Sequence, residues 1–239
     1  MLKQHVRLQI DTKNGAAPLA KKLGLNRNAV YVLVLDESGR EKARLILAFK
    51  APQTKIIAFL KQARHAAAAK GASGVDLLLR LLDDADAGIR YDAAQSLSRL
   101  GPNARQATSK LTTLLKDRAG RPSVAWQAAI ALKKIGPPAK DALAALTAVL
   151  EEPRADVALR QQAAFAMVAI DPKGKTVLPA LITALETTKS LVRFGVVIAL
   201  DNLGPAAKPA EKALRSALPR TSGQVATRIQ HVLRNLSGS

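Results

Sequence analysis

Apolar residues recur with helical spacing through most of the chain, most clearly between residues 124 and 152. The first helical face in this stretch is formed by Val124, Ala128, Ala129, Leu132 and Ile135. A Gly-Pro pair at 136–137 then ends the helix, because glycine accepts unusual backbone angles and proline has no amide hydrogen to continue the hydrogen-bond ladder. Leu143, Leu146, Val149 and Leu150 line one side of a second helix. The pattern predicts a helical hairpin.

The same unit occurs four times, starting near Ile89, Val124, Leu159 and Val192. Its turns open at Gly101, Gly136, Asp171 and Gly204, each followed by Pro, at intervals of 35, 35 and 33 residues. Pairs of Ala on the first helix would let neighbouring helices approach closely. One such hairpin cannot bury its apolar surface alone, but stacked copies can. We therefore expect an α-solenoid of about five helical hairpins over residues 75–239.

The motif Val-Arg-x-x-Ala-Ala on one helix, with Gly-Pro-x-Ala at the turn, resembles HEAT repeats of the short, phycobilisome lyase-like variety. The resemblance covers residues 74–236, and the last copy, TRIQHVLRNL, reads as a cap. The arginine that such repeats place near the start of one helix matches Arg90, Arg160, Arg193 and, more loosely, Arg228. Ala125 stands at this position in the remaining copy, so that junction is expected to lack a hydrogen bond that its neighbours make.

Residues 1–70 follow a different pattern. They read as strands at 4–10, 30–35 and 43–49 with helices at 17–23 and 52–70, the two later strands pairing antiparallel. This order resembles the C-terminal half of a thioredoxin-like domain; the alternative is an unrelated small α/β cap. The chain has no Cys, which excludes thiol–disulfide chemistry. We expect a small α/β domain over 1–70, a linker at 71–74 and the solenoid over 75–239.

The chain carries a formal net charge of +19, spread along its length. Its 48% hydrophobic content suffices for a core, and the aromatic share is only 3%. No apolar run is long enough to span a membrane, and the first residues do not resemble a signal peptide, so a cytoplasmic location is expected.

Candidate chemistry is sparse. The three His, at 5, 65 and 231, show no metal-ligand spacing, and no nucleophile elbow or phosphate loop is present. The acidic cluster at 83–86 could bind a cation, but we expect it to cap a helix–helix turn. We expect no catalytic residue, cofactor or metal. An enzyme, such as a glycosylase or lyase built from these repeats, would have Asp201 or Asp92 as its nearest carboxylates.

One helical face, displaced from the core face, carries the most informative side chains. At spacing i, i+4, i+7 it gathers four of the chain's seven aromatic residues. In HEAT-like arrays this helix lines the concave side. The candidate partner-binding residues are Tyr91, Trp126, Ile130, Lys133, Phe165, Val168, Phe194 and Ile198. They either form a groove with aromatic anchors or fill gaps between repeats, beneath residues 1–70 in part.

These observations favour a non-enzymatic scaffold that binds a protein or peptide, including an acidic one, on the concave face of the array. The alternative is a basic nucleic-acid-binding protein, because the charge of +19 would attract phosphate. Cations converging on the concave face would favour nucleic acid, and an apolar centre would favour protein. Fold alone does not decide between them.

Overall fold

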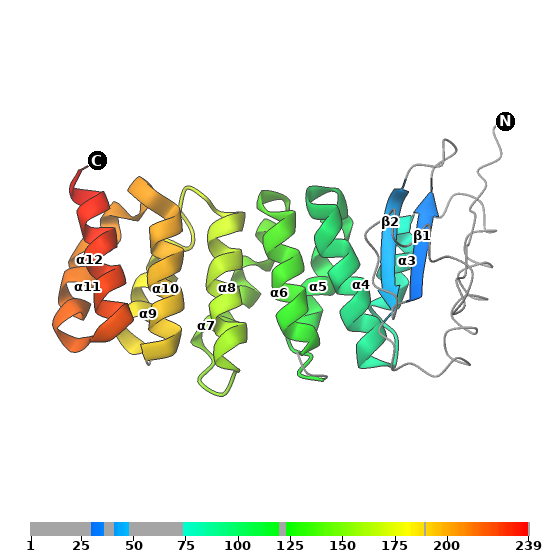
Figure 1. The fold of residues 1–239 in the computed structure, drawn as a ribbon, viewed down its shortest axis with the longest axis horizontal. Helices are drawn as coiled ribbons and strands as arrows, with labels where there is room; N and C mark the ends of the chain where they lie inside the picture. Colours follow the sequence, from blue (N-terminus) through cyan, green and yellow to red (C-terminus); the bar gives the residue numbers. More distant parts are fainter. Residues whose placement is uncertain (1–29, 36–40, 48–73, 120–122, 189, 239) are drawn as a thin grey trace.

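A computed structural model describes residues 30–35, 41–47, 74–119, 123–188 and 190–238 (Figure 1). The strand expected at 4–10, the helices expected at 17–23 and 52–70, and most of the expected linker lie outside these residues. The described helices stack side by side in one direction, with the β-strands at one end (Figure 1).

The α-helices agree closely with the periodicity of the sequence. They are α3 (Gly74–Leu81), α4 (Ala87–Leu100), α5 (Thr108–Leu114), α6 (Val124–Ile135), α7 (Leu143–Glu151), α8 (Val157–Ile170), α9 (Leu178–Thr187), α10 (Ser190–Leu203), α11 (Glu211–Ala217) and α12 (Gly223–Ser237). Short 3₁₀ segments follow three of the turns and the end of α11: η1 (Gly101–Ala107), η2 (Pro137–Ala142), η3 (Gly204–Ala210) and η4 (Leu218–Arg220).

The helices form two layers. The even-numbered helices α4, α6, α8, α10 and α12 pack against one another in sequence order, and the odd-numbered helices α3, α5, α7, α9 and α11 lie behind them (Figure 1). We call these the even layer and the odd layer. The expected array of stacked hairpins is confirmed for residues 75–239. No described helix is both long and apolar enough to cross a membrane.

Two strands, β1 (Val30–Leu35) and β2 (Glu41–Leu47), form an antiparallel pair in which Val30 lies opposite Leu47. This confirms the antiparallel pairing expected between these segments. β2 lies beside α4, at the first end of the even layer (Figure 1). The rest of the thioredoxin-like pattern falls outside the described residues and stays an expectation.

Small residues set the spacing of the even layer. The Ala pairs of α4, α6 and α8 are fully buried, and Val196 and Val197 take the same place in α10. A β-carbon added to Gly195 of α10 would come within 2.5 Å of the side chain of Gln161 in α8. The even helices therefore approach closely at these positions.

The turns leaving the even layer use glycine for a conformational reason. Gly101, Gly136 and Gly204 have φ values of 55°, 71° and 56°. At Gly101 and Gly136 ψ is −131° and −143°, a combination that residues with a side chain rarely adopt. The third turn differs, because Asp171 keeps φ at −119° and its carboxylate accepts the amide hydrogens of Thr176 and Val177. The Asp-Pro pair thus marks an equivalent turn, which opens with a side-chain cap from Asp171 instead of a positive-φ glycine.

At the edge opposite these turns, the repeated arginines link each hairpin to the one before it. Arg160 donates to the carbonyl oxygen of Leu150 at 2.8 Å, and Arg193 donates to those of Leu185 at 2.8 Å and Thr188 at 2.6 Å. These carbonyls end odd helices and have no partner inside the helix. The arginines therefore complete the hydrogen bonding of one hairpin from the next.

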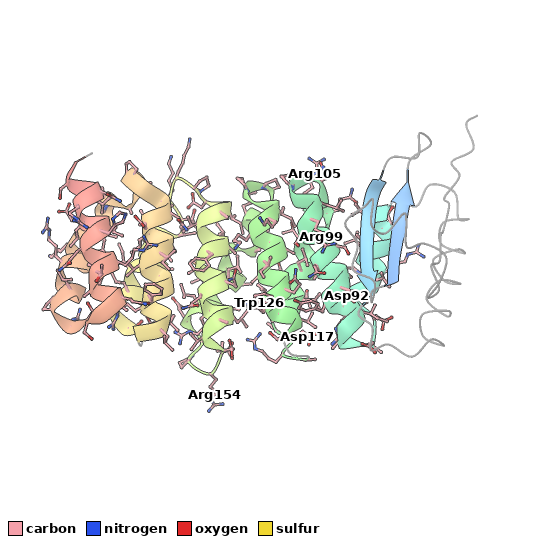
Figure 2. All side chains as sticks on the ribbon, viewed as in Figure 1. Asp92, Arg99, Arg105, Asp117, Trp126 and Arg154 are labelled. Atoms are coloured by element: carbon pink, nitrogen blue, oxygen red, sulfur yellow. The ribbon has the colours of Figure 1, made fainter. Side chains whose placement is uncertain are left out.

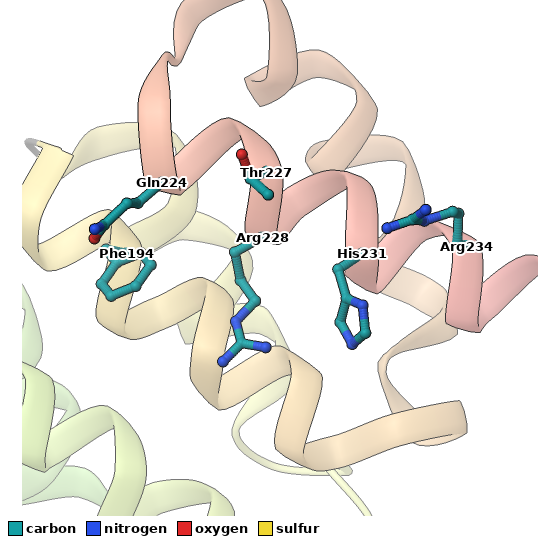
Figure 3. Close-up of a pocket in the computed structure, with 6 residues that line it drawn as sticks. All are labelled: Phe194, Gln224, Thr227, Arg228, His231 and Arg234. Carbon is teal, nitrogen blue, oxygen red and sulfur yellow. The ribbon is translucent and has the colours of Figure 1, made fainter.

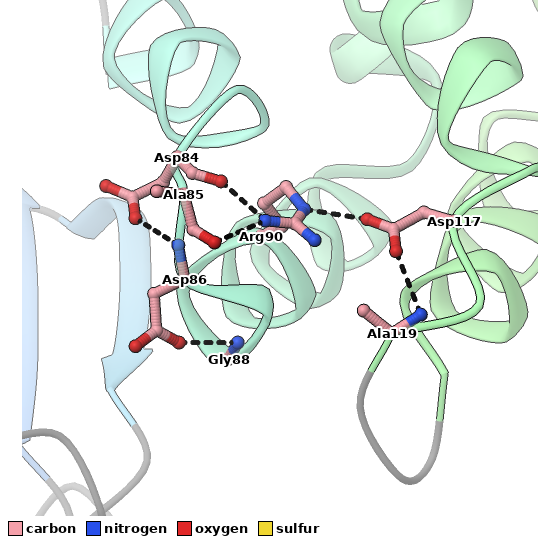
Figure 4. A network of polar contacts seen from close by, with 7 residues as sticks. All are labelled: Asp84, Ala85, Asp86, Gly88, Arg90, Asp117 and Ala119. Atoms are coloured by element: carbon pink, nitrogen blue, oxygen red, sulfur yellow. Dashed lines mark hydrogen bonds and ion pairs between the residues drawn. The ribbon is translucent and has the colours of Figure 1, made fainter.

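Arg90 performs the same role at the first junction and adds an ion pair (Figure 4). It donates to the carbonyls of Asp84 and Ala85 and to the carboxylate of Asp117, at 2.6, 3.0 and 2.7 Å. Partial burial by itself would raise the pKa of Asp117. The hydrogen bonds from Arg90 and the Ala119 amide, with the charges of Arg90 and Arg118, outweigh it and hold this pKa below its ordinary value.

Ala125 has no side chain that could make such a bond from the next helix, but the equivalent carbonyl receives a donor from the loop that directly follows α5. Arg118, in the loop before α6, donates to the carbonyl of Leu115, the residue at the C-terminal end of α5. Leu115, Leu150 and Leu185 occupy equivalent places in their hairpins, 35 residues apart. Arg118 also pairs with Glu152 at 2.8 Å. A loop arginine thus replaces the helix arginine, because the acceptor carbonyl needs a donor wherever it comes from.

Replacing Asp117 with Asn should lower the free energy of unfolding by about 1–2 kcal/mol near neutral pH, because the ion pair with Arg90 is lost. The folded-state pKa lies below the unfolded value of about 3.9. The carboxylate therefore contributes its full stability above that pH and loses it as the pH falls through the folded pKa. Urea unfolding at several pH values should show the two proteins converging in acid. The exposed Asp141→Asn serves as a control that leaves stability unchanged.

Replacing Arg118 with Ala should cost about 1 kcal/mol, because the carbonyl of Leu115 loses its side-chain donor. Arg154→Ala, which removes an exposed arginine from the equivalent loop of the next hairpin, is the matched control (Figure 2). Thermal unfolding followed by circular dichroism measures both. Equal stability of the two variants would contradict the role given to Arg118.

Candidate functional site

The candidate residues all lie on the even layer, in three columns that cross consecutive helices. The first column comprises Tyr91, Trp126, Gln161 and Phe194; the second, Gln95, Ile130, Phe165 and Ile198; the third, Ser98, Lys133, Val168 and Asp201. Because the helices run in the same direction, residues at the same repeat position fall side by side. The expectation that these side chains share one face therefore agrees with the arrangement of α4, α6, α8 and α10.

Burial separates the members of these columns. Val168 is only 6% exposed and belongs to the core, so we leave it out of the candidate surface. The other residues of the columns are half-buried. Trp126, Phe165 and Phe194 pack against the core with part of their surface while another part reaches solvent. This partial burial is compatible with both interpretations, because each ring packs against the core and keeps some surface accessible to solvent.

Lys133 belongs to the third column and reaches toward the second. Its ammonium group is 5.8 Å from the centre of the Phe165 ring and donates to the side-chain oxygen of Gln162 at 3.3 Å. Partial burial, with a further contribution from the charge of Lys134, lowers the pKa of Lys133. The cation lies over an aromatic ring, and no carboxylate of the described residues pairs with it, so its charge is available to an acidic group of a partner.

The two carboxylates considered for an enzyme, Asp92 and Asp201, take part in contacts within the fold. Asp92 is 6% exposed, and burial followed by the charge of Asp92 raises the pKa of the neighbouring Tyr91. Asp201 pairs with Arg228 at 3.1 Å and lies 3.9 Å from the ring of His231. Arg228 therefore makes an ion pair with the even layer rather than the carbonyl contact expected from its place in the repeat.

A shallow pocket of about 420 Å³ continues the candidate surface between α10 and α12 (Figure 3). Phe194 forms its wall on α10, and side chains spaced along one face of α12 form the rest: Gln224, Thr227, Arg228, His231 and Arg234. The helical spacing on α12 was visible in the sequence, but the terminal copy was interpreted as a cap. The pocket combines one aromatic ring with cationic groups and suits an anionic group beside an apolar one.

The acidic cluster is explained by capping. Asp86 accepts the amide hydrogen of Gly88 at the start of α4, and Asp84 accepts that of Asp86, both at 2.8 Å (Figure 4). Asp83 pairs with Lys110 across the hairpin. Within the described part of the chain, no group of His, Cys, Asp and Glu is arranged to hold a metal ion.

Comparison with known proteins agrees with this geometry. Residues 75–159 match the family model described as HEAT repeats. The complex of CpcE and CpcF of phycocyanin lyase from Nostoc is similar at 25% identity, over 72% of this chain and 68% of that chain, with a TM-score of 0.56. No curated protein matches the chain.

Two engineered proteins share the fold. One is 23% identical over 79% of this chain and 85% of that chain, with a TM-score of 0.51. The other is 22% identical over 80% and 95%, with a TM-score of 0.54. Together with the two helical layers and the repeated turns, these findings make residues 75–239 a HEAT-like array of stacked hairpins.

Proposed function

We propose that this array is a non-enzymatic scaffold that binds a protein or peptide partner on the exposed face of the even layer. The observation that carries the proposal is the set of half-buried apolar side chains crossing consecutive helices: Tyr91, Trp126, Ile130, Phe165, Phe194 and Ile198. Such a surface is large, continuous and preformed. Aromatic anchors in partly desolvated positions contribute most of the energy in many protein interfaces.

The charges around this surface define the partner further. Lys133 beside Phe165 and the cations of the α12 pocket favour an acidic segment whose apolar side chains cover the rings. The proposed partner is therefore a protein segment that carries both apolar and acidic residues. The related Nostoc structure is a complex of two chains, which supports binding of a protein as a use of this fold.

An enzymatic reading has less support. The Nostoc relative is described as part of a phycocyanin lyase, at an identity of 25%. In this chain the candidate carboxylates are engaged in structure, since Asp201 pairs with Arg228 and Asp92 is buried. The described surface offers apolar contacts and positive charge, and we propose that it binds a partner rather than catalyses a reaction.

Ile130→Glu should abolish capture of the partner, because it places a charge in the middle of the apolar surface. Ile182→Glu is the matched control, since Ile182 is the same residue type, also half-buried, but on α9 in the odd layer. Affinity purification with quantitative mass spectrometry would compare both variants with the parent chain, after melting curves confirm that each is folded. A partner retained by both variants would refute the assignment to the even layer.

Binding should also be visible from Trp126, the only tryptophan in the chain. Its half-buried ring should be quenched by acrylamide to an intermediate degree in the free protein. A captured partner should shift the emission to shorter wavelength and reduce quenching, because it removes the exposed edge of the ring from water. An unchanged spectrum with the partner bound would place the interface elsewhere.

A further inference from the structure

The edge at which even helices turn into odd helices carries one cation per repeat. Arg105, Lys140, Lys175 and Lys208 each stand four residues after the residue that opens the turn. All four side chains are exposed. We call this set the cation ladder. Figure 2 shows its first member, Arg105, at one edge of the stack, with Asp117 and Arg154 at the opposite edge.

The ladder is reinforced by its neighbours. Exposed cations that flank it come from the ends of even helices and from the third turn: Arg99, Lys134, Lys173 and Arg234. The nearby carboxylates are fewer than these cations, and apart from the exposed Asp141 they are engaged in contacts within the fold. Asp171 is occupied with two backbone amides, and Glu211 pairs with Lys208 and Arg215. Of the described ladder cations, only Lys208 has an ion-pair partner and a carbonyl acceptor, Leu236.

The opposite edge shows that this is not a consequence of composition alone. There the exposed cations Arg80, Lys116 and Arg154 are accompanied by three cations that pair with carboxylates: Arg90 with Asp117, Arg118 with Glu152, and Lys110 with Asp83. The two edges of the same array therefore differ in kind. At one edge, part of the positive charge is neutralised by ion pairs within the fold, whereas at the other edge one cation per repeat is exposed to solvent.

Folding stability does not explain the ladder. Its members precede the N-terminal ends of the odd helices, where the helix dipole disfavours positive charge. Cations in neighbouring repeats are separated by roughly one helix spacing of about 8–10 Å, which is comparable to the Debye length at physiological salt. They therefore repel one another. A polyanion bound along the edge would relieve this repulsion, and the relief would favour binding.

The surroundings of the ladder indicate which polyanion fits. Exposed prolines and polar groups lie between its members, including Pro102, Pro137 and Pro172. The aromatic residues described on the array belong to the even-layer face and not to this edge, so the edge offers neither hot-spot anchors for a protein nor a stacking platform for unpaired bases. What it offers is charge at regular spacing, and charge alone suffices to bind a phosphate backbone.

We propose that the cation ladder is a sequence-independent binding site for the phosphate backbone of duplex nucleic acid. Four cations separated by three intervals of about 10 Å extend over roughly 30 Å, the length of about nine base pairs. Lysine predominates in the ladder and acts as a point charge that accepts phosphate in many orientations. This site is separate from the even-layer face, and each can be disrupted without the other.

The test is fluorescence anisotropy of the full chain with a labelled duplex of about 20 base pairs, from about 50 to about 200 mM salt. The ladder variant combines Arg105→Gln, Lys140→Gln and Lys175→Gln, and leaves Lys208 in place because it bonds within the fold. The control variant combines Arg80→Gln, Lys116→Gln and Arg154→Gln, which removes the same charge from the opposite edge. Melting curves verify that both variants fold.

We expect the parent chain to bind, with an affinity that falls steeply with salt. The ladder variant should lower the slope of log affinity against log salt by about 3, since each lost phosphate contact contributes about 0.9. The control should keep most of the slope. Equal losses in both variants would reduce the effect to net charge and overturn the proposal. It would also be overturned by a parent chain that does not bind at low salt, or by polyglutamate of equal charge competing as well as the duplex.

Discussion

The carbonyl groups at the ends of the odd helices are the constraint on which the array depends. Each helix leaves its last carbonyls without partners, and in a stack these carbonyls are covered by the next hairpin. Arg160 and Arg193 satisfy them from the following even helix, while Arg118 does so from a loop. Where the arginine comes from the next helix, a hairpin is complete only when its neighbour is in place, and this couples those repeats in addition to their shared apolar contacts.

The array therefore has two edges whose charged side chains differ in their roles. The edge of arginines and capping aspartates uses its charges internally, as the network around Arg90 and Asp117 shows. The opposite edge closes its turns with positive-φ glycines or with the carboxylate of Asp171, and needs no cation for that purpose. The formation of these turns therefore does not determine which cations stand at this edge. In a repeat protein, a residue placed once per unit becomes a straight row on the surface.

Much of this fold could be predicted from the sequence, because the Gly-Pro turns and paired alanines have fixed conformational and steric meanings. The helices and the antiparallel β1–β2 pair followed directly. Helical spacing also identified the even-layer face, but it could not separate the buried Val168 from the half-buried Ile130, because their exposure depends on how closely adjacent helices approach. Arg118 was missed because it lies out of register, and a carbonyl accepts a donor from any part of the chain.

The position of the aromatic column along the helices bears on how the two proposed surfaces relate. Trp126 is the third residue of α6 and Phe194 the fifth of α10, so both lie toward the edge with paired charges. The cation ladder follows the C-terminal ends of the same helices. A helix of this length extends about 18–21 Å at 1.5 Å per residue, which exceeds the range of a screened charge at physiological salt. A protein segment on the rings and a phosphate backbone on the ladder would therefore bind the array largely independently. Lys133 lies between the two surfaces, so its charge is the one that both partners would experience.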